Sequence, residues 1–357
     1  MKYEMNVKER TLHFLQPAGT SRGVYYERRS WFVSLKNNKG NTGVGECAPL
    51  PNLSCDDIPE YDKLLRDFAY ELCRTGEIPY YALKNYPSML FGLETAILSL
   101  QRNGSRLSDT PFADGKEGIP INGLVWMGTY DDMLSRMEEK LRKGFRCVKI
   151  KIGAIDFYDE LELLRLIRKR FSKDSVELRV DANGAFSPTE ALSRIEQLAR
   201  YDLHSIEQPI KQGNTKELVR LCHDTPLPIA LDEELIGIND SEEKERLLDT
   251  IRPQYLVLKP SLHGGMRGVR EWVKMARQRG IGSWITSALE SNVGLNAIAH
   301  LCASVFGPHI TMPQGLGTGQ LFVDNIAMPI EINGDELWYN GSNANTPVRD
   351  NRVSYTI

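Results

Sequence analysis

Long hydrophobic runs, a strong net charge and paired cysteines are all missing from this sequence. Its 357 residues carry 44 Lys and Arg against 47 Asp and Glu, so the net charge is −3. That balance predicts no basic surface for nucleic acid or acidic membranes. No stretch approaches the roughly 18 to 20 apolar residues that span a bilayer, and the segment MKYEMNVKERTLHF lacks the apolar core of a secretory signal. We therefore expect a cytoplasmic protein without nucleic-acid or membrane partners, and leave self-association into a homo-oligomer open.

Several motifs of common enzyme classes are also absent. The six cysteines are scattered without a C-x-x-C pair, which predicts reduced thiols rather than a zinc site. No G-x-G-x-x-G motif follows a predicted strand, and neither a Walker loop nor a G-x-S-x-G elbow occurs, so nucleotide binding and serine hydrolysis lack support. The six histidines are dispersed and we interpret them as structural, with His263 the least certain.

Two kinds of pattern divide the chain. Residues 1–117 predict antiparallel strands at TLHFL, GVYYERRSWFVSLKN and NTGVGECAP, followed by two helices, which is an α+β unit. Residues 118–320 alternate strands with helices about eight times, which predicts an α/β fold with a parallel sheet closed into a barrel. Residues 321–357 again indicate strand and turn, and we expect this tail to return to the N-terminal unit.

The alternating region predicts elements at regular intervals. The expected strands are INGLVWM, CVKIKIG, VELRVDAN, HSIEQP, PIALDEE, QYLVLKPS, GSWITSALES and a last one near 309–313. The expected helices are 131–143, 156–171, 188–200, 215–223, 240–249, 265–279 and 292–304.

Three acidic residues end successive strands. Asp181, Glu207 and Asp232 follow one another at intervals of 26 and 25 residues, about what one strand, one helix and two loops use in such a barrel. A single acid at a strand end more often serves a turn or a helix cap. Three in register would repel one another unless a cation neutralised them. Oxygen donors without His or Cys favour Mg²⁺.

Lysines flank the three acids along the chain. Lys149 and Lys151 are two apart on one strand and so share a face. An arbitrary K-x-K on a strand usually faces solvent, but here Val148, Ile150 and Ile152 would face the helices and leave both lysines inside. Burial beside another cation is expected to lower a lysine pKa and make it a usable base. Lys259, one repeat after Asp232, would face Lys151 across a bound substrate.

Other residues at the strand ends are candidates for binding. Strand parity places Arg179 beside Asp181, with Asn183 just beyond the strand end. Glu233 and Glu234 compete with Asp232 as ligands, although spacing favours Asp232, and Glu233 would then pair with Lys259. Ser287 in ITSALES and Gly315 in QGLGTG lie where backbone N–H groups could bind an anionic substrate arm, although an ordinary turn explains them almost as well.

Together, K-x-K, D-A-N, E-Q-P, D-E and K-P at five successive strand ends resemble the enolase superfamily, in the branch of the muconate-lactonizing enzymes. The resemblance covers essentially the whole chain, and GVGECAPLP is similar to the substrate-gating loop of the family's capping domain. It implies a TIM-like (β/α)7β barrel with an α+β capping domain completed by the C-terminal tail. Gly19 to Arg22 and Ala48 to Leu50 are implied contacts of a substrate arm.

Within that branch the motifs VKIKIG, LRVDANGAF, SIEQPI, LDEELIG, LKPSLHGG, TSALESNVGL and QGLGTGQLF are most similar to the menaquinone-pathway dehydratases. The resemblance implies that Asp181, Glu207 and Asp232 bind Mg²⁺, for which Mn²⁺ can substitute. It implies that the substrate is a small carboxylate, which loses a proton next to its carboxylate group to give an enediolate.

The resemblance also gives the lysines their roles. Lys151 becomes the base that later acts as an acid, while Lys149 and Lys259 provide electrostatic support. Two alternatives stay open at this point. An N-succinylamino acid racemase or dipeptide epimerase would use Lys151 and Lys259 as two bases, although PQGLGTGQLF lacks the acidic pair that binds the ammonium group in the family's epimerases. The second alternative is a catalytically silent barrel that only binds a metal or a small acid.

Overall fold

An antiparallel sheet and two helices form the first unit of the chain. The computed structural model describes residues 2–20 and 23–341. In it β1 (Glu4–Thr20), β2 (Gly23–Lys36) and β3 (Thr42–Cys47) pair in that order, and α1 (Tyr61–Thr75) and α2 (Pro87–Arg102) cover the sheet. The contact between α2 and β3 is close, since a Cβ at Gly45 would lie 1.9 Å from the carbonyl oxygen of Gly92. Glycines therefore allow helix and strand to pack backbone to backbone.

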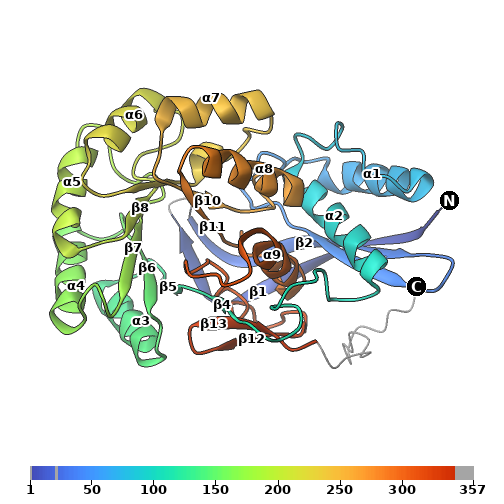
Figure 1. The fold of residues 1–357 in the computed structure, drawn as a ribbon, viewed down its shortest axis with the longest axis horizontal. Coiled ribbons are helices and arrows are strands. Elements are labelled where there is room, and N and C mark those ends of the chain that lie inside the picture. The colour runs from blue at the N-terminus through green and yellow to red at the C-terminus, as the bar shows by residue number, and fades with distance from the viewer. Residues whose placement is uncertain (1, 21–22, 342–357) are drawn as a thin grey trace.

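A seven-stranded parallel sheet forms the second unit (Figure 1). In spatial order its strands are β5 (Gly123–Val125), β6 (Cys147–Lys151), β7 (Glu177–Asp181), β8 (Ser205–Glu207), β9 (Ile229–Leu231), β10 (Tyr255–Leu258) and β11 (Gly282–Ile285). The helices between and after them are α3 (Tyr130–Arg142), α4 (Phe157–Arg170), α5 (Ala191–Leu198), α6 (Thr215–Asp224), α7 (Ser241–Ile251), α8 (Gly265–Gln278) and α9 (Asn292–Phe306). In this order each strand pairs with its neighbours in sequence. The sheet is curled, since residues next to its two outer strands both pair with residues 314–315.

Two residues link the outer strands of this sheet. Gln314 forms a parallel bridge with Ile121, just before β5, and Gly315 forms one with Thr286, just after β11. A full strand was expected near 309–313, and that prediction was wrong in position and length. Pro313 has no backbone N–H group to donate to a neighbouring strand, and the bridges occur at the two residues after it.

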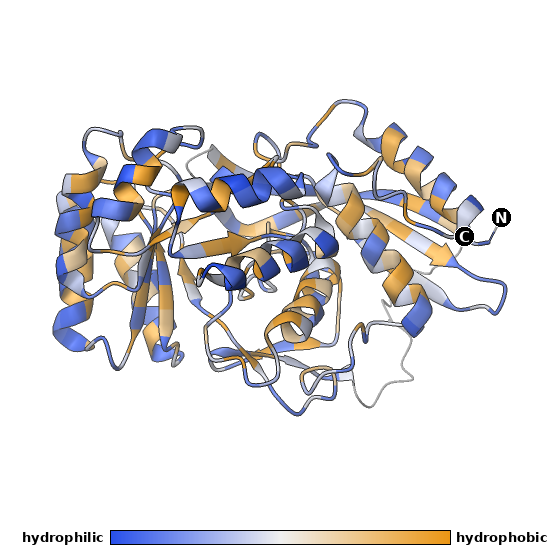
Figure 2. Ribbon diagram, turned by 45° about the horizontal axis from the view of Figure 1, so that its top comes forward, coloured by the Kyte–Doolittle hydropathy of each residue, from blue (hydrophilic) through white to orange (hydrophobic). Residues whose placement is uncertain are grey.

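Apolar side chains fill the space between the sheet and its helices. Val148, Ile150 and Ile152 are buried in this core, as their alternation with the lysines predicted. Figure 2 shows hydrophobic residues concentrated in the strands and on the helix faces turned toward them. The seven predicted helices all occur, with ends shifted by up to three residues, and α5 continues into the 3-10 turn Ala199–Tyr201. The predicted α/β, TIM-like fold class is therefore confirmed.

The segment after the barrel contacts both units. Phe14 on β1 bridges Phe322, and the backbone N–H of Leu15 donates to the carbonyl oxygen of Leu321 at 2.8 Å. Further on, β12 (Ile330–Asn333) pairs with β13 (Glu336–Tyr339), and β13 pairs with β4 (Ile119–Pro120), which precedes the barrel. The rest of the expected tail, 342–357, lies outside the described residues. Within the described ranges, no helix combines the length and apolar character needed to cross a membrane.

Candidate active site

Backbone register brings the acidic strand ends to one level. In the parallel sheet Lys151 pairs with Asp181, and Asp181 pairs with Glu207. Asp232 follows directly after β9, the next strand in the sheet. The three carboxylates are at most 1% exposed. Carboxyl ends of parallel strands meet at one edge, so the acids gather beneath a single mouth.

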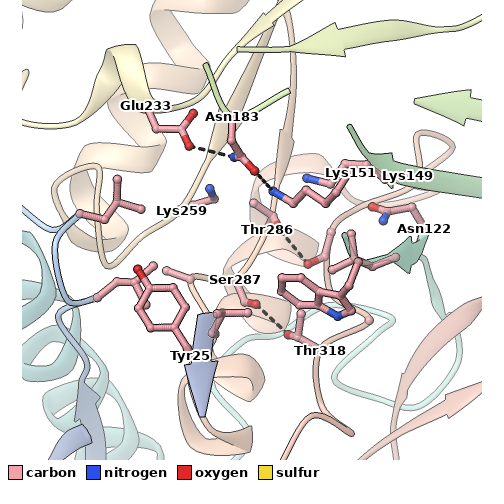
Figure 3. A pocket seen from close by; sticks show the side chains of 18 residues that line it. Tyr25, Asn122, Lys149, Lys151, Asn183, Glu233, Lys259, Thr286, Ser287 and Thr318 are labelled. Atoms are coloured by element: carbon pink, nitrogen blue, oxygen red, sulfur yellow. Dashed lines mark hydrogen bonds between the residues drawn. The ribbon is translucent and has the colours of Figure 1, made fainter. Parts of the chain in front are cut away.

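The lysine side chains point into this acidic group. The Nζ atom of Lys149 lies 2.9 Å from Glu207 Oε2 and 3.1 Å from Asp181 Oδ2. The Nζ atom of Lys151 lies 2.6 Å from Asp181 Oδ2 and also donates to Asn183 Oδ1 at 2.6 Å. Figure 3 shows Lys259 entering the same space from the opposite side. Each buried carboxylate thus faces an ammonium group.

The charges shift the pKa values of these groups in opposite directions. Burial opposes ionisation of Asp181, but Lys151 and Lys149 outweigh it and hold the pKa of Asp181 far below its ordinary value. Burial lowers the pKa of Lys149, but Glu207 and Asp181 outweigh it and raise the pKa. The pKa of Lys259 is raised in the same way by Asp232. The expected lowering of the lysine pKa was therefore wrong for Lys149, because the prediction counted the neighbouring cation and not the acids in contact.

Glu233 has a different partner from the one expected. Lys259 forms its ion pair with Asp232 Oδ2. Glu233 accepts a hydrogen bond from Asn183 Nδ2 at 2.9 Å, so the predicted Glu233–Lys259 pair was wrong. Burial and the charge of Asp232 raise the pKa of Glu233 to about 7. Asn183 consequently joins Lys151 to Glu233 through the two ends of one amide (Figure 3).

The acidic group contains unsatisfied oxygens. Glu207 Oε1, Asp232 Oδ1 and Glu233 Oε2 are buried and have no hydrogen-bond partner within the described part of the chain. Such atoms are costly unless something binds them. As the side chains stand, no three His, Cys, Asp or Glu within residues 2–20 and 23–341 are grouped closely enough to hold a metal ion. The unpaired hard oxygens on neighbouring acids nevertheless fit a divalent cation chemically.

A pocket opens directly above these charges. Its polar lining includes Asn183, Ser287 and Gly315, which were all expected to bind substrate. The Ser287 hydroxyl shares a hydrogen bond with that of Thr318 at 2.7 Å. The full lining is Tyr25, Leu50, Leu53, Asn122, Leu124, Trp126, Lys149, Lys151, Asn183, Glu233, Lys259, Thr286, Ser287, Ala288, Leu289, Gly315, Gly317 and Thr318. The N-terminal unit and the barrel both contribute to this wall.

Arg179 lies elsewhere, contrary to the expectation that it binds substrate. It is 1% exposed and is not part of the pocket lining. Its Nε donates to Glu177 Oε1 at 2.7 Å, its Nη1 donates to the carbonyl oxygen of Pro313 at 3.0 Å, and its guanidinium lies 4.4 Å from the Trp284 ring centroid. Strand alternation correctly predicted that Arg179 and Asp181 lie on the same face of β7. Arg179, however, lies one layer deeper in the barrel than Asp181.

Some lining residues were not predicted. Leu124 and Trp126 face the pocket from β5 and its end, and Leu124 is the register partner of Lys149. Because Leu124 and Trp126 are two residues apart, strand alternation places both side chains on one face, and the sequence could have predicted this. Tyr25 reaches the pocket from β2, and no local pattern indicated this. Among the expected cap contacts, Leu50 lines the pocket, while residues 21–22 lie outside the described residues.

Comparison with protein families gives two matches. The model described as "Enolase C-terminal domain-like" matches residues 132–321, and the model described as "MenC, N-terminal domain" matches residues 21–100. Together they cover most of the capping unit and the barrel. A curated protein of Desulfotalea psychrophila named o-succinylbenzoate synthase is 42% identical, covering 94% of this chain and 98% of its own.

Other relatives carry different activities. The L-Ala-D/L-Glu epimerase of Bacillus subtilis is 30% identical over 81% of each chain. Among solved structures, MenC from Desulfotalea psychrophila matches with a TM-score of 0.80 and 39% identity, covering 95% of this chain and all of the other. The muconate lactonizing enzyme of Pseudomonas putida matches with a TM-score of 0.75 at 22% identity, covering 94% and 93% of the two chains, and this likeness concerns the fold alone.

Proposed function

The chain belongs to the enolase superfamily, and we propose that it acts as an o-succinylbenzoate synthase. The proposed reaction removes water from 2-succinyl-6-hydroxy-2,4-cyclohexadiene-1-carboxylate to give o-succinylbenzoate, a step of menaquinone biosynthesis. The similarity to the Desulfotalea psychrophila synthase over nearly both full lengths carries the choice of substrate. The geometry of the pocket supports the chemistry.

Lys151 is the proposed base. Its ammonium group is held between Asp181 and Asn183 and lines the pocket. After delivering a proton to solvent, the amine would take the proton from the carbon next to the substrate carboxylate. It would then return a proton to the departing hydroxide on the same face, so one lysine serves both halves of the elimination.

The other charged groups stabilise the charge that develops. Lys149 and Lys259 are buried cations on the pocket wall. Lys259 lies opposite Lys151 (Figure 3) and can act on the flat intermediate as a cation over a π-system. Asp181, Glu207 and Asp232 are the proposed ligands of Mg²⁺, or of Mn²⁺ in its place, which lowers the cost of negative charge on the substrate carboxylate.

The proposal extends to the architecture. We infer a (β/α)7β barrel over residues 118–320, because residues 314–315 bridge its two edges. Residues 1–117 act as its cap, because Tyr25, Leu50 and Leu53 line the pocket. Residues 321–324 support a return of the tail to the cap through their pairing with β1. A cytoplasmic location is part of the same proposal and agrees with six free cysteines.

One assay on purified protein with Mg²⁺ tests the proposal. We expect rapid dehydration of the cyclohexadiene substrate, with a kcat/KM far above that for any exchange reaction. A chain without this activity would overturn the assignment.

Racemisation of N-succinylamino acids is the second candidate. It is favoured by Lys151 and Lys259 facing each other across the pocket, which suits removal and return of a proton on opposite faces. The test is deuterium incorporation at the α-carbon in heavy water. Deuterium incorporation without dehydration would make the protein a racemase.

A further inference from the structure

One buried arginine connects the capping unit to the barrel beside the pocket. Arg28 lies on β2 and is completely buried. Its Nη2 donates to the carbonyl oxygen of Ala48 at 2.6 Å, and its Nη1 donates to that of Pro49. From the barrel it contacts the carbonyl oxygens of Ala288 and Leu289, both at 3.3 Å. One guanidinium group therefore bonds two loops of two different units.

Both loops form the wall of the pocket. The loop held from the cap leads into Leu50 and Leu53, and the loop held from the barrel comprises Ser287, Ala288 and Leu289. Arg28 itself is not part of the lining. It can therefore act on a substrate only through the loops that it holds.

The barrel loop has a conformation that needs such support. Leu289 has a φ of +63°, which a residue with a side chain rarely adopts. Its carbonyl oxygen accepts the hydrogen bond from Arg28 Nε. The fixed planar fork of a guanidinium can bind several carbonyl groups at once, which the single ammonium group of lysine cannot reproduce.

Two buried acidic side chains, Glu290 and Glu46, act electrostatically on Arg28. Glu290 accepts from the backbone N–H of Ala288 at 2.6 Å and from Ser261 Oγ at 2.5 Å. Glu46, on β3, accepts from the backbone N–H groups of Ser291 and Gly294 at the start of α9. Arg28, Glu290 and Glu46 thus each bond backbone groups between residues 288 and 294, which favours one arrangement of this segment.

We propose that Arg28 is a positioning residue that sets the shape of the substrate-facing wall by tying residues 48–49 to residues 288–289. The expected effect of Arg28 on the kinetics rests on the proposed function. In the proposed reaction, proton removal depends on Lys151 on β6 and on its partner Asp181 on β7. Neither is among the printed hydrogen-bond partners of Arg28, which are carbonyl oxygens of residues 48, 49, 288 and 289. Loss of Arg28 should therefore weaken substrate binding while leaving the rate of the bound complex nearly unchanged.

The kinetic test uses Arg28→Lys and Arg28→Gln in the full chain with Mg²⁺. We expect KM for the cyclohexadiene substrate to rise about tenfold in Arg28→Lys, which corresponds to about 1.4 kcal/mol, and further in Arg28→Gln. The kcat should stay within about threefold of the parent. The lysine variant keeps the buried charge and guards against a failure to fold.

Glu94→Ala is the matched control. Glu94 on α2 is also a buried contact between cap and barrel, since it accepts from the backbone N–H groups of Met266 and Arg267. It does not line the pocket. We expect Glu94→Ala to lower Tm with KM unchanged. An Arg28 variant that lowers Tm with KM unchanged, or that lowers kcat alone, would overturn the proposal.

Hydrogen–deuterium exchange separates this proposal from the proposed function. In Arg28→Lys we expect faster exchange in peptides covering 48–54 and 286–291, and parent-like exchange in both for Glu94→Ala. This result is independent of which substrate the protein turns over. Unchanged exchange in both peptides of Arg28→Lys would overturn the positioning role even if dehydration were confirmed.

Discussion

The barrel interior holds buried charge at two levels, and the two levels differ in how that charge is satisfied. Arg179 and Asp181 lie two residues apart on β7 and on the same face. At the deeper level Arg179 is enclosed by Glu177, the carbonyl oxygen of Pro313 and the Trp284 ring. At the upper level Asp181 contacts two lysines that open into a pocket. At the deeper level the buried Arg179 is paired with Glu177 and does not line the pocket, whereas the upper level opens into the pocket and has unpaired carboxylate oxygens that can bind a cation.

This difference explains why residue type and strand face were not enough to identify the site. Both levels contain the charged side chains that suggest catalysis. Only the upper level combines them with solvent access and with orphan carboxylate oxygens on neighbouring strands. Three of the following four experiments test the contrast, and the one at Glu94 adds a buried acid outside both levels for comparison. They are given from the largest expected effect to the smallest.

Lys151→Ala should remove the central group of the upper level. We expect kcat to fall about 10⁴-fold, because in the proposed mechanism the same amine takes and returns a proton. Mg²⁺ binding, measured by calorimetry, should change little. Lys143→Ala is the control, since Lys143 forms an exposed ion pair with Glu139 at the end of α3. Full turnover in Lys151→Ala would contradict the proposed role and favour a silent, metal-binding barrel.

Arg179→Gln should act on the deeper level alone. Breaking a buried ion pair costs about 3 kcal/mol of unfolding free energy, which urea denaturation can measure. The kcat/KM of the folded variant should stay within about threefold of the parent. Arg170→Gln, which removes an exposed pair with Glu138, should cost less than about 1 kcal/mol. A large rise in KM for Arg179→Gln would restore its sequence-based role in substrate binding.

Glu94 supplies a buried acid outside both levels. Burial raises its pKa from 4.5 to about 7, against the opposing effect of two backbone N–H groups and of Arg267 and Arg270. A raised pKa means that the folded state holds the proton more tightly. The contribution of Glu94 to stability is therefore complete below about pH 4.5 and is lost as the pH rises through about 7.

Glu94→Gln should remove this pH dependence. The stability difference between variant and parent should change by on the order of 2 to 3 kcal/mol between about pH 4.5 and 8. Urea unfolding across that range measures it. The exposed Glu71, which pairs with Arg74 on α1, gives the control Glu71→Gln. Parallel stability curves for Glu94→Gln and parent would show that folding does not raise the pKa of Glu94.

Asn183→Gly should give the smallest effect. Asn183 accepts from Lys151, the proposed base, and donates to Glu233, so its loss removes the hydrogen bond to Lys151 and the one that holds the amide in place. We expect kcat to fall about tenfold. Glycine keeps the backbone, because Asn183 has a φ of +43°. Asn103→Gly is the matched control at an exposed position with a φ of +53°. Equal kcat values for the two variants would mean that Asn183 does not orient Lys151.

Much of the fold was predictable because the repeat imposes a periodicity. Alternating strands and helices fixed the α/β class, and the alternation of Val148, Lys149, Ile150 and Lys151 placed both lysines inside the barrel. The predicted membership of the enolase superfamily is confirmed by the family matches and the relatives. These features follow from side-chain order along single strands, which the sequence contains directly.

The sequence by itself determined which strands carry the acids and lysines, because a period of two and a repeat of about 25 residues are local properties. Only the tertiary structure decided which ammonium group meets which carboxylate, that Arg179 lies below the pocket, and that Tyr25 and Arg28 reach the site from the capping unit. Depth along the barrel axis and contacts between distant segments depend on how the two units pack. No pattern within a single element encodes that packing.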